Sequence, residues 1–179
     1  MKSNRRSFVR TAIAAAVMSS LGLAAQAQET IKIGVLATLE GPFAAGGADG
    51  MRGAELALRE RNFMAGGKKI EMVKASSNAQ PPVAVAAVRK LVEQDKVQIV
   101  VGPLSGGEGI AVKDYSKTVP NITIINGSSG AQATTLVNPS PNFFRFNNEG
   151  AQWMVGLGAE AMKRGYKKVA LISEDYSFP

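Results

Sequence analysis

The sequence predicts an α/β fold with three layers, in which helices cover both faces of a doubly wound, mostly parallel sheet. Runs of β-branched and apolar residues alternate with amphipathic helical patterns about every 30 residues. Loops rich in glycine and serine follow these runs on one side only, as expected where the carboxyl ends of parallel strands meet. Parallel strands need crossover connections, so we expect right-handed βαβ units.

The first unit begins with a buried strand at residues 30–37, where apolar and β-branched residues follow one another. A helix is expected at 49–65, because Asp49 is a suitable N-cap and Gly66-Gly67 a suitable stop. Residues 69–73 alternate between polar and apolar side chains, which is typical of a strand near the edge of a sheet.

The next two units follow the same pattern. A helix is expected at 83–94, because the two prolines just before it fit only the first turn of a helix. Residues 97–101 form the next buried strand, residues 108–117 a further helix and residues 122–125 a fourth strand. This order extends the parallel sheet by one strand per unit.

The last part of the chain begins with the long loop 126–142, whose serine, threonine, glycine and proline content indicates a functional loop. A short extended piece follows at 143–146, with alternating phenylalanines that favour packing in a core or between lobes. A helix is expected at 149–163, with Trp153 and Met154 assigned to packing, and a fifth strand at 169–172.

Composition excludes several kinds of chemistry. The chain has no cysteine and no histidine, so it lacks disulfides, thiol nucleophiles, a Ser-His-Asp triad and histidine-based metal sites. Ser105 has no glycine two residues before it, as a nucleophile elbow requires, and Glu40, Glu108 and Asp114 are isolated acids best explained as solvated or capping. No cofactor is expected.

The first 27 residues have the three parts of an export signal. Four basic residues and no acid lie at positions 2–10, and an apolar run covers 11–25. Ala25-Gln26-Ala27 then predicts a cleavage site. Interruptions in the apolar run disfavour the alternative of a retained membrane anchor, so no stable membrane insertion is expected after cleavage. Arg5 to Arg10 also resembles a twin-arginine motif, which leaves the export route open.

Charge does not favour nucleic acid as a partner. Beyond the export segment the chain carries 17 basic and 14 acidic side chains, a small and scattered excess. The glycine and serine loops instead favour a small ligand. Ser105-Gly106-Gly107 precedes a helix whose free N–H groups suit an anion, and Ser128-Ser129-Gly130 follows the next strand. Each loop alone could be an ordinary cap or turn, but several on one edge favour a site.

Several segments, in order, resemble periplasmic solute-binding proteins of the leucine/isoleucine/valine-binding type. The matching segments are Ile31-Lys32-Ile33-Gly34-Val35, Gly41-Pro42-Phe43-Ala44, Gly50 to Ala57, Lys90 to Val97, Val101-Gly102-Pro103-Leu104-Ser105 and Lys168 to Ile172. The resemblance implies a type I periplasmic binding protein with two lobes. The expected organisation is a signal peptide at 1–27, a first ligand-binding lobe at 28–146, and a hinge with the start of a second lobe at 147–179.

The resemblance also implies which residues contact the ligand. Gly106 and Gly130 stand where members of the family often carry hydroxyl residues, so the ligand stays open between a branched-chain or other amino acid, an amide and a small aromatic or carboxylic acid. The candidate ligand-binding residues are Ser105, Gly106, Gly107, Ser128, Ser129, Gly130, Phe43, Tyr176 and Phe178.

The function implied by the resemblance is capture of a small-molecule ligand in the periplasm and its delivery to the membrane permease of an ABC transporter, without catalysis. The alternatives are a sensor on the same fold that signals to a regulatory partner, and an exported α/β enzyme. Members of the family are longer than this chain. We therefore expect a fragment that ends after an uncovered strand and binds its ligand weakly by itself.

Overall fold

A computed structural model describes residues 29–173, so the expected export segment, Tyr176 and Phe178 lie outside the described residues. The described part contains a sheet with the strand order β2-β3-β1-β4-β5-β6. Strand β2 pairs antiparallel with β3, and the other neighbours pair parallel. The strands are β1 (Thr30–Thr38), β2 (Met64–Ala65), β3 (Lys68–Ser77), β4 (Ile99–Val101), β5 (Thr123–Asn126) and β6 (Phe143–Arg145).

The chain winds outward from β1 in both directions. It passes from β1 to β3 on one side, then returns across β1 to β4 and continues to β5 and β6. The reversal lies between β1 and β4, and in open α/β sheets ligands bind outside the carboxyl ends of the strands at such a switch point. The doubly wound sheet predicted from the sequence is confirmed.

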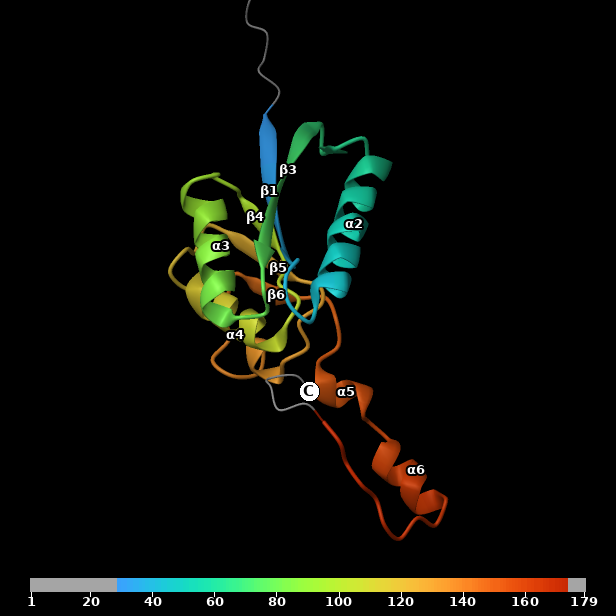
Figure 1. Cartoon of the computed structure of the whole chain (residues 1–179). Coiled ribbons are helices and arrows are strands. Elements are labelled where there is room, and N and C mark those ends of the chain that lie inside the picture. The colour runs from blue at the N-terminus through green and yellow to red at the C-terminus, as the bar shows by residue number, and fades with distance from the viewer. Residues whose placement is uncertain (1–28, 174–179) are drawn as a thin grey trace, which may run out of the picture.

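Helices form the outer two layers. Helix α2 (Ala44–Glu60) lies on one face of the sheet, and α3 (Pro81–Glu93) and α4 (Gly106–Ser116) lie side by side on the other (Figure 1). The larger core fills the space under α3 and α4, where Val88, Val112 and Ile124 are fully buried. A smaller core under α2 contains Val35, Ala37 and Met51.

The two faces of β6 differ in how well they are covered. The pairing register aligns Val35, Val101, Ile125 and Phe144 across the face that carries α2. Helix α2 contacts only β1 and β3 extensively, and Phe144 is 48% exposed, whereas Phe143 on the opposite face is 5% exposed. The face beside α2 is therefore open over the last strands of the described sheet.

The predicted helix at 49–65 was wrong at both ends. Helix α2 begins at Ala44, and Phe43 rather than Asp49 is its N-cap residue. It ends at Glu60, after which Asn62 and Phe63 take positive φ angles. Gly66 and Gly67 then form the turn between β2 and β3 instead of ending the helix, because the antiparallel β2 pairs with the start of β3. The strand expected at 69–73 is correspondingly longer.

The predictions for the last part of the described chain were wrong in detail. The helix expected at 149–163 is two short helices, α5 (Gly150–Trp153) and α6 (Leu157–Lys163), separated by Gly156 with φ +91°. No strand forms at 169–172. Trp153 and Met154 are half exposed rather than packed. Figure 1 shows this segment extending away from the sheet, where no neighbouring strand of the described chain is available to pair with it.

One further absence concerns membrane association. None of the helices within residues 29–173 combines the length and the apolar character needed to span a membrane.

Candidate functional site

A small hollow lies at the carboxyl ends of β1, β4 and β5, beside the switch point. Its volume is about 70 Å³. Its walls come from the first turns of α2, from the loop after β4 and from the loop after β5, and they are mostly apolar or glycine. The lining includes Gly46, Gly47, Leu104, Gly127 and Ser128. Two loops and the start of α2, which are far apart in the sequence, thus meet at the carboxyl ends of parallel strands.

The loop after β4 is held by a buried polar cluster. Ser105 is the N-cap of α4, and its side chain accepts from the backbone N–H of Glu108 at 3.4 Å. The Glu108 carboxylate accepts from the Ser105 N–H at 3.3 Å, so the two residues form a capping box. The same carboxylate oxygen accepts from the Thr38 hydroxyl at 3.0 Å, and that hydroxyl lies 3.3 Å from the Ser77 hydroxyl.

Thr38 and Ser77 end the neighbouring strands β1 and β3, while Ser105 and Glu108 are the N-cap and a first-turn residue of α4. Each of them is at most 5% exposed. One oxygen of Glu108, Oε1, is buried without a hydrogen-bond partner among the described residues. Burying a carboxylate without a cationic partner costs free energy, and losing one of its hydrogen bonds would add to that cost. The bonds to Thr38 and Ser105 therefore favour one geometry of this loop.

The loop after β5 is held by Asn126, the last residue of that strand. Its side-chain carbonyl accepts from the backbone N–H groups of Ser128 at 3.2 Å and Ser129 at 2.8 Å. Its amide group donates to the Ser129 carbonyl at 2.8 Å. The Ser129 hydroxyl is buried against Gly109 of α4, where a Cβ atom would lie only 2.1 Å from that oxygen. The loop is thereby pressed onto α4.

The candidate residues are placed differently within this region. Ser128 is exposed and lines the hollow, whereas Ser129 and Gly130 are buried. Ser105 and Gly106 are buried, with the Ser105 hydroxyl engaged in the capping box, and Gly107 is half-buried. Phe43 is half-buried at the start of α2. Among the candidate serines, Ser128 therefore has the side chain most open to a solute.

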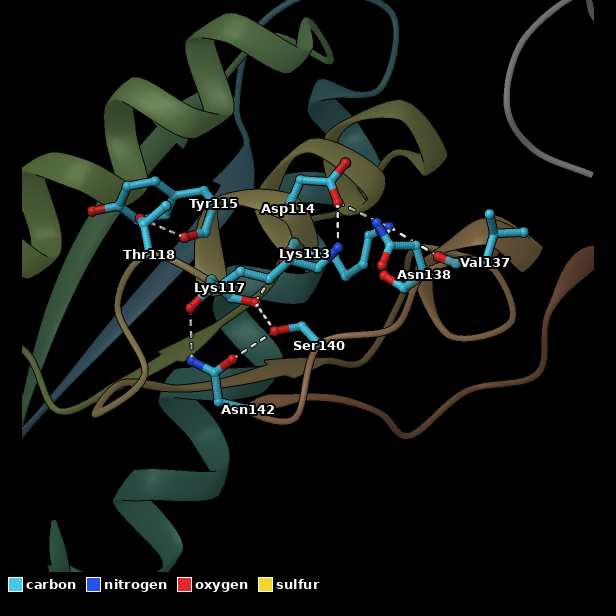
Figure 2. Close-up of polar contacts among 10 residues, drawn as sticks. Lys113, Asp114, Tyr115, Lys117, Thr118, Val137, Asn138, Ser140 and Asn142 are labelled. Carbon is cyan, nitrogen blue, oxygen red and sulfur yellow. Dashed lines mark hydrogen bonds and ion pairs between the residues drawn. The ribbon is translucent and has the colours of Figure 1, made fainter.

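The far end of α4 is tied to the long loop that leads into β6. Figure 2 shows Lys113, which is 3% exposed, pointing toward the loop, where its ammonium donates to the carbonyls of Val137 and Asn138 at 3.1 and 3.4 Å. The Ser140 hydroxyl accepts from Ser116 and donates to Asn142, both at 2.7 Å. These contacts fix the end of the loop that precedes β6 to α4.

Two titratable groups near this tie have shifted pKa values. Burial opposes ionisation of Asp114, but the ammonium groups of Lys117 and Lys113 prevail and hold its pKa below the ordinary value of 3.8. Burial raises the pKa of Tyr115 above 10.0, and Glu93 adds to this rise. The Arg89 guanidinium, 5.7 Å from the centre of the Tyr115 ring, opposes it. Both groups lie away from the hollow.

The described residues contain no group of three or more acidic side chains that could hold a metal ion. The hollow offers apolar surface, glycine backbone and the exposed Ser128, which are groups suited to contact with a small solute, whereas Ser105 to Gly107 do not line it. Glu108, predicted to be solvated or capping, does cap α4 but is fully buried.

The residues that hold the loops beside the hollow were not predicted from the sequence. Thr38, Ser77 and Asn126 each end a strand and are buried, and they hold the loops in place. For Thr38 and Asn126 a signal was present in the sequence, because each is a polar residue directly after a run of apolar or β-branched residues, whereas Ser77 follows Lys74, Ala75 and Ser76 and has no such signal. Asn147, which also contacts the loop after β5, carried no such signal.

Comparison with known proteins gives a consistent result. The sequence pattern of a family described as periplasmic binding protein matches residues 30–179. An amino acid binding protein of Pseudomonas aeruginosa is 34% identical over 133 residues, which cover 73% of this chain and 36% of that protein. The chain thus spans little more than a third of the length of this relative.

Solved structures agree with the fold. A solute-binding protein of an ABC transporter from Rhodopseudomonas palustris BisB5, in complex with 3,4-dihydroxybenzoic acid, matches with a TM-score of 0.76 and 26% identity, over 83% of this chain and 40% of that one. A branched-chain amino acid transporter substrate-binding protein from Streptococcus pneumoniae, in complex with isoleucine, matches with a TM-score of 0.65 and 28% identity, over 75% and 39%.

The family and these structural neighbours are solute-binding proteins rather than enzymes. The fold, the place of the hollow and the extent of the family match lead to the same conclusion: the chain belongs to the periplasmic binding protein family.

Proposed function

We propose that these 179 residues are the N-terminal part of a longer protein that captures a small organic solute in the periplasm and delivers it to the permease of an ABC transporter. The observation that carries the proposal is the hollow at the switch point, where two loops meet the start of α2 and Ser128 is exposed. The expected export segment supports a periplasmic location, and the permease is supported by the ABC-transporter neighbours.

The proposed solute is an amino acid, an amide or a small aromatic or carboxylic acid. The lining of the hollow is mostly apolar and glycine, which suits a flat or branched apolar body. The N-terminus of α4 and the Ser128 hydroxyl would supply hydrogen bonds to a carboxylate. The proposed lobes follow the expected boundaries, with the first at 28–146 and the second starting in 147–179. Tyr176 and Phe178 stay proposed contacts from the second lobe.

The test is a thermal-shift screen of the complete protein, meaning the uninterrupted gene product. The panel contains branched-chain amino acids, their amides, and benzoates with and without hydroxyl groups. A ligand at a hundred times its Kd should stabilise the native state by about 2.7 kcal/mol. The proposal fails if no member of the panel raises the melting temperature.

A matched pair of variants then tests the position of the site. Ser128→Ala removes one hydrogen bond to the solute and should weaken binding about tenfold. Asn121→Ala changes an exposed polar residue just before β5, at the opposite end of that strand, and should leave the Kd unchanged. Equal affinities of the two variants, measured by calorimetric titration, would place the solute elsewhere.

A further inference from the structure

The segment that leaves the sheet after β6 runs along the loop after β5. We call residues 145–150 the crossing segment and residues 126–131 the β5 loop. The Phe146 N–H donates to the Asn126 carbonyl at 2.9 Å and so extends the pairing of β5 with β6 by one bond. The Gly150 N–H donates to the Gly130 carbonyl at 2.9 Å. The two segments are thus joined near both ends.

Side chains join the same two segments between these backbone bonds. The Asn147 amide group donates to the carbonyls of Ser128 at 3.0 Å and Ser129 at 3.3 Å. The Arg145 guanidinium donates to the Ala131 carbonyl at 3.3 Å. Four residues of the crossing segment therefore bond the β5 loop, and the contacts of Asn147 fall on the two serines beside the hollow.

Asn147 and Asn126 both hold the β5 loop. Asn126 belongs to the sheet, accepts from both serine N–H groups and donates to the Ser129 carbonyl, whereas Asn147 belongs to the crossing segment and donates to the carbonyls of both serines. The Asn147 side-chain oxygen is buried without a partner among the described residues. Burial of this oxygen is unfavourable, and the donor contacts of the Asn147 amide group offset that free-energy cost.

These contacts have a mechanical consequence. The carbonyls of Ser128 and Ser129 are thus bonded to the crossing segment, while the exposed residue Ser128 lines the hollow. A rotation of the crossing segment relative to the sheet would have to move the loop or break the Asn147 contacts. The position of the loop and the direction of the crossing segment are therefore coupled.

We propose that Asn147 is a positioning residue that couples the solute-contacting β5 loop to closure of the two lobes. The inference rests on the proposed function, because it takes residues 147–179 to be the hinge and start of a second lobe. Asn147 does not touch the solute. It sets the direction in which the crossing segment leaves the first lobe when Ser128 contacts the solute. Solute binding and closure of the lobes are thereby coupled.

The test compares Asn147→Ala and Asn147→Asp with Asn148→Ala in the complete protein. Asn147→Asp keeps the size of the side chain but replaces the donor with oxygens that repel the two carbonyls. Asn148 is the exposed neighbour and serves as the matched control. The ligand is the panel compound with the largest thermal shift on the wild-type protein. The Kd is measured by calorimetry, and closure by the change in radius of gyration on ligand addition in X-ray scattering.

Both Asn147 variants should bind at least tenfold more weakly than the wild type and show a smaller ligand-induced decrease in radius of gyration, whereas Asn148→Ala should match the wild type in both. The melting temperature of the ligand-free protein separates this from a stability defect, because the affinity loss should persist at 20 °C below the melting temperature of each variant. A wild-type Kd and wild-type closure in the Asn147 variants would overturn the inference while leaving the proposed function intact. If no panel compound binds the wild type, the proposed function fails and the inference falls with it.

Discussion

The loop after β4 and the loop after β5 lie on the same edge of the sheet, but they are held in different ways. The loop after β4 is fixed by Glu108, which is fully buried and accepts hydrogen bonds from the Thr38 hydroxyl and the Ser105 N–H. The second is fixed by Asn126 from the sheet and by Asn147 from the segment that leaves it. One loop thus belongs to the rigid sheet, whereas the other connects the sheet to the rest of the chain.

The largest expected effect is on the rigid loop. Glu108→Ala leaves the buried Ser105 N–H without its acceptor, leaves the Thr38 hydroxyl with only the Ser77 hydroxyl as a partner, and creates a cavity, so we expect a loss of about 3 kcal/mol in the free energy of unfolding. Glu108→Gln keeps one acceptor oxygen and should lose less. Urea unfolding of both variants, followed by circular dichroism, checks the order. If Glu108→Ala lost less unfolding free energy than Glu108→Gln, the proposed role of Glu108 in holding this loop would be contradicted.

The second loop should respond to Asn126. Asn126→Ala removes three hydrogen bonds inside a buried region and should cost about 2 kcal/mol. Asn126→Asp retains the two acceptor contacts with Ser128 and Ser129 and loses only the donor contact, so its loss should be smaller. Amide exchange of residues 127–131, measured by mass spectrometry, should accelerate in the alanine variant more than exchange of residues 102–107. Equal acceleration in both loops would remove the distinction between them.

The contact between α4 and the second loop can be changed at a single position. Gly109→Ala places a Cβ atom 2.1 Å from the Ser129 hydroxyl oxygen, so we expect overpacking to cost about 1–2 kcal/mol. Gly53→Ala in α2 meets no atom within 4 Å and should instead stabilise the protein by about 0.5–1 kcal/mol. Chemical unfolding of the two variants should give opposite signs. Combining Gly109→Ala with Ser129→Ala should recover part of the loss, since the closest contact is then gone.

The smallest effect concerns the far end of α4. Because the pKa of Asp114 is lower in the folded state than its ordinary value of 3.8, Asp114 stabilises the protein above that pH and loses this contribution as the pH falls through the lowered pKa. Asp114 is largely exposed, so the contribution should be at most about 0.5 kcal/mol. Asp114→Asn should be less stable than the wild type at pH 7 and equally stable near pH 2. A constant difference across this range would exclude the ion pairs as its cause.

The strand ends show how far sequence patterns reach. The apolar runs at 30–37 and 122–125 predicted β1 and β5 closely, because a strand buried on both faces must be apolar along its whole length. The helix at 49–65 was misplaced, since Asp49 and Gly66-Gly67 are locally suitable signals and the actual limits depend on where β2 pairs with β3. Where a local capping signal and a non-local strand pairing favour different helix ends, the pairing determines the end.

The candidate site shows the same division. The glycine and serine loops were predicted to share one edge of the sheet, and the hollow lies at that edge, because the carboxyl ends of parallel strands are determined by the order of strands and helices. Which serine is open could not be predicted. Ser105 and Ser129 are turned into buried contacts with Glu108 and Gly109, and Ser128 is left exposed. That difference depends on how α4 packs beside the loops.

The sequence by itself determined the alternation of strands and helices, the edge of the sheet that carries the polar loops and the absence of cysteine and histidine chemistry. These follow from periodicity and composition, which are properties of neighbouring residues. Only the tertiary structure decided that Glu108 is buried at the switch point and that Asn147 bonds the β5 loop, because these contacts join residues 70 and 19 positions apart. Such contacts form only when packing brings distant strand ends and segments together.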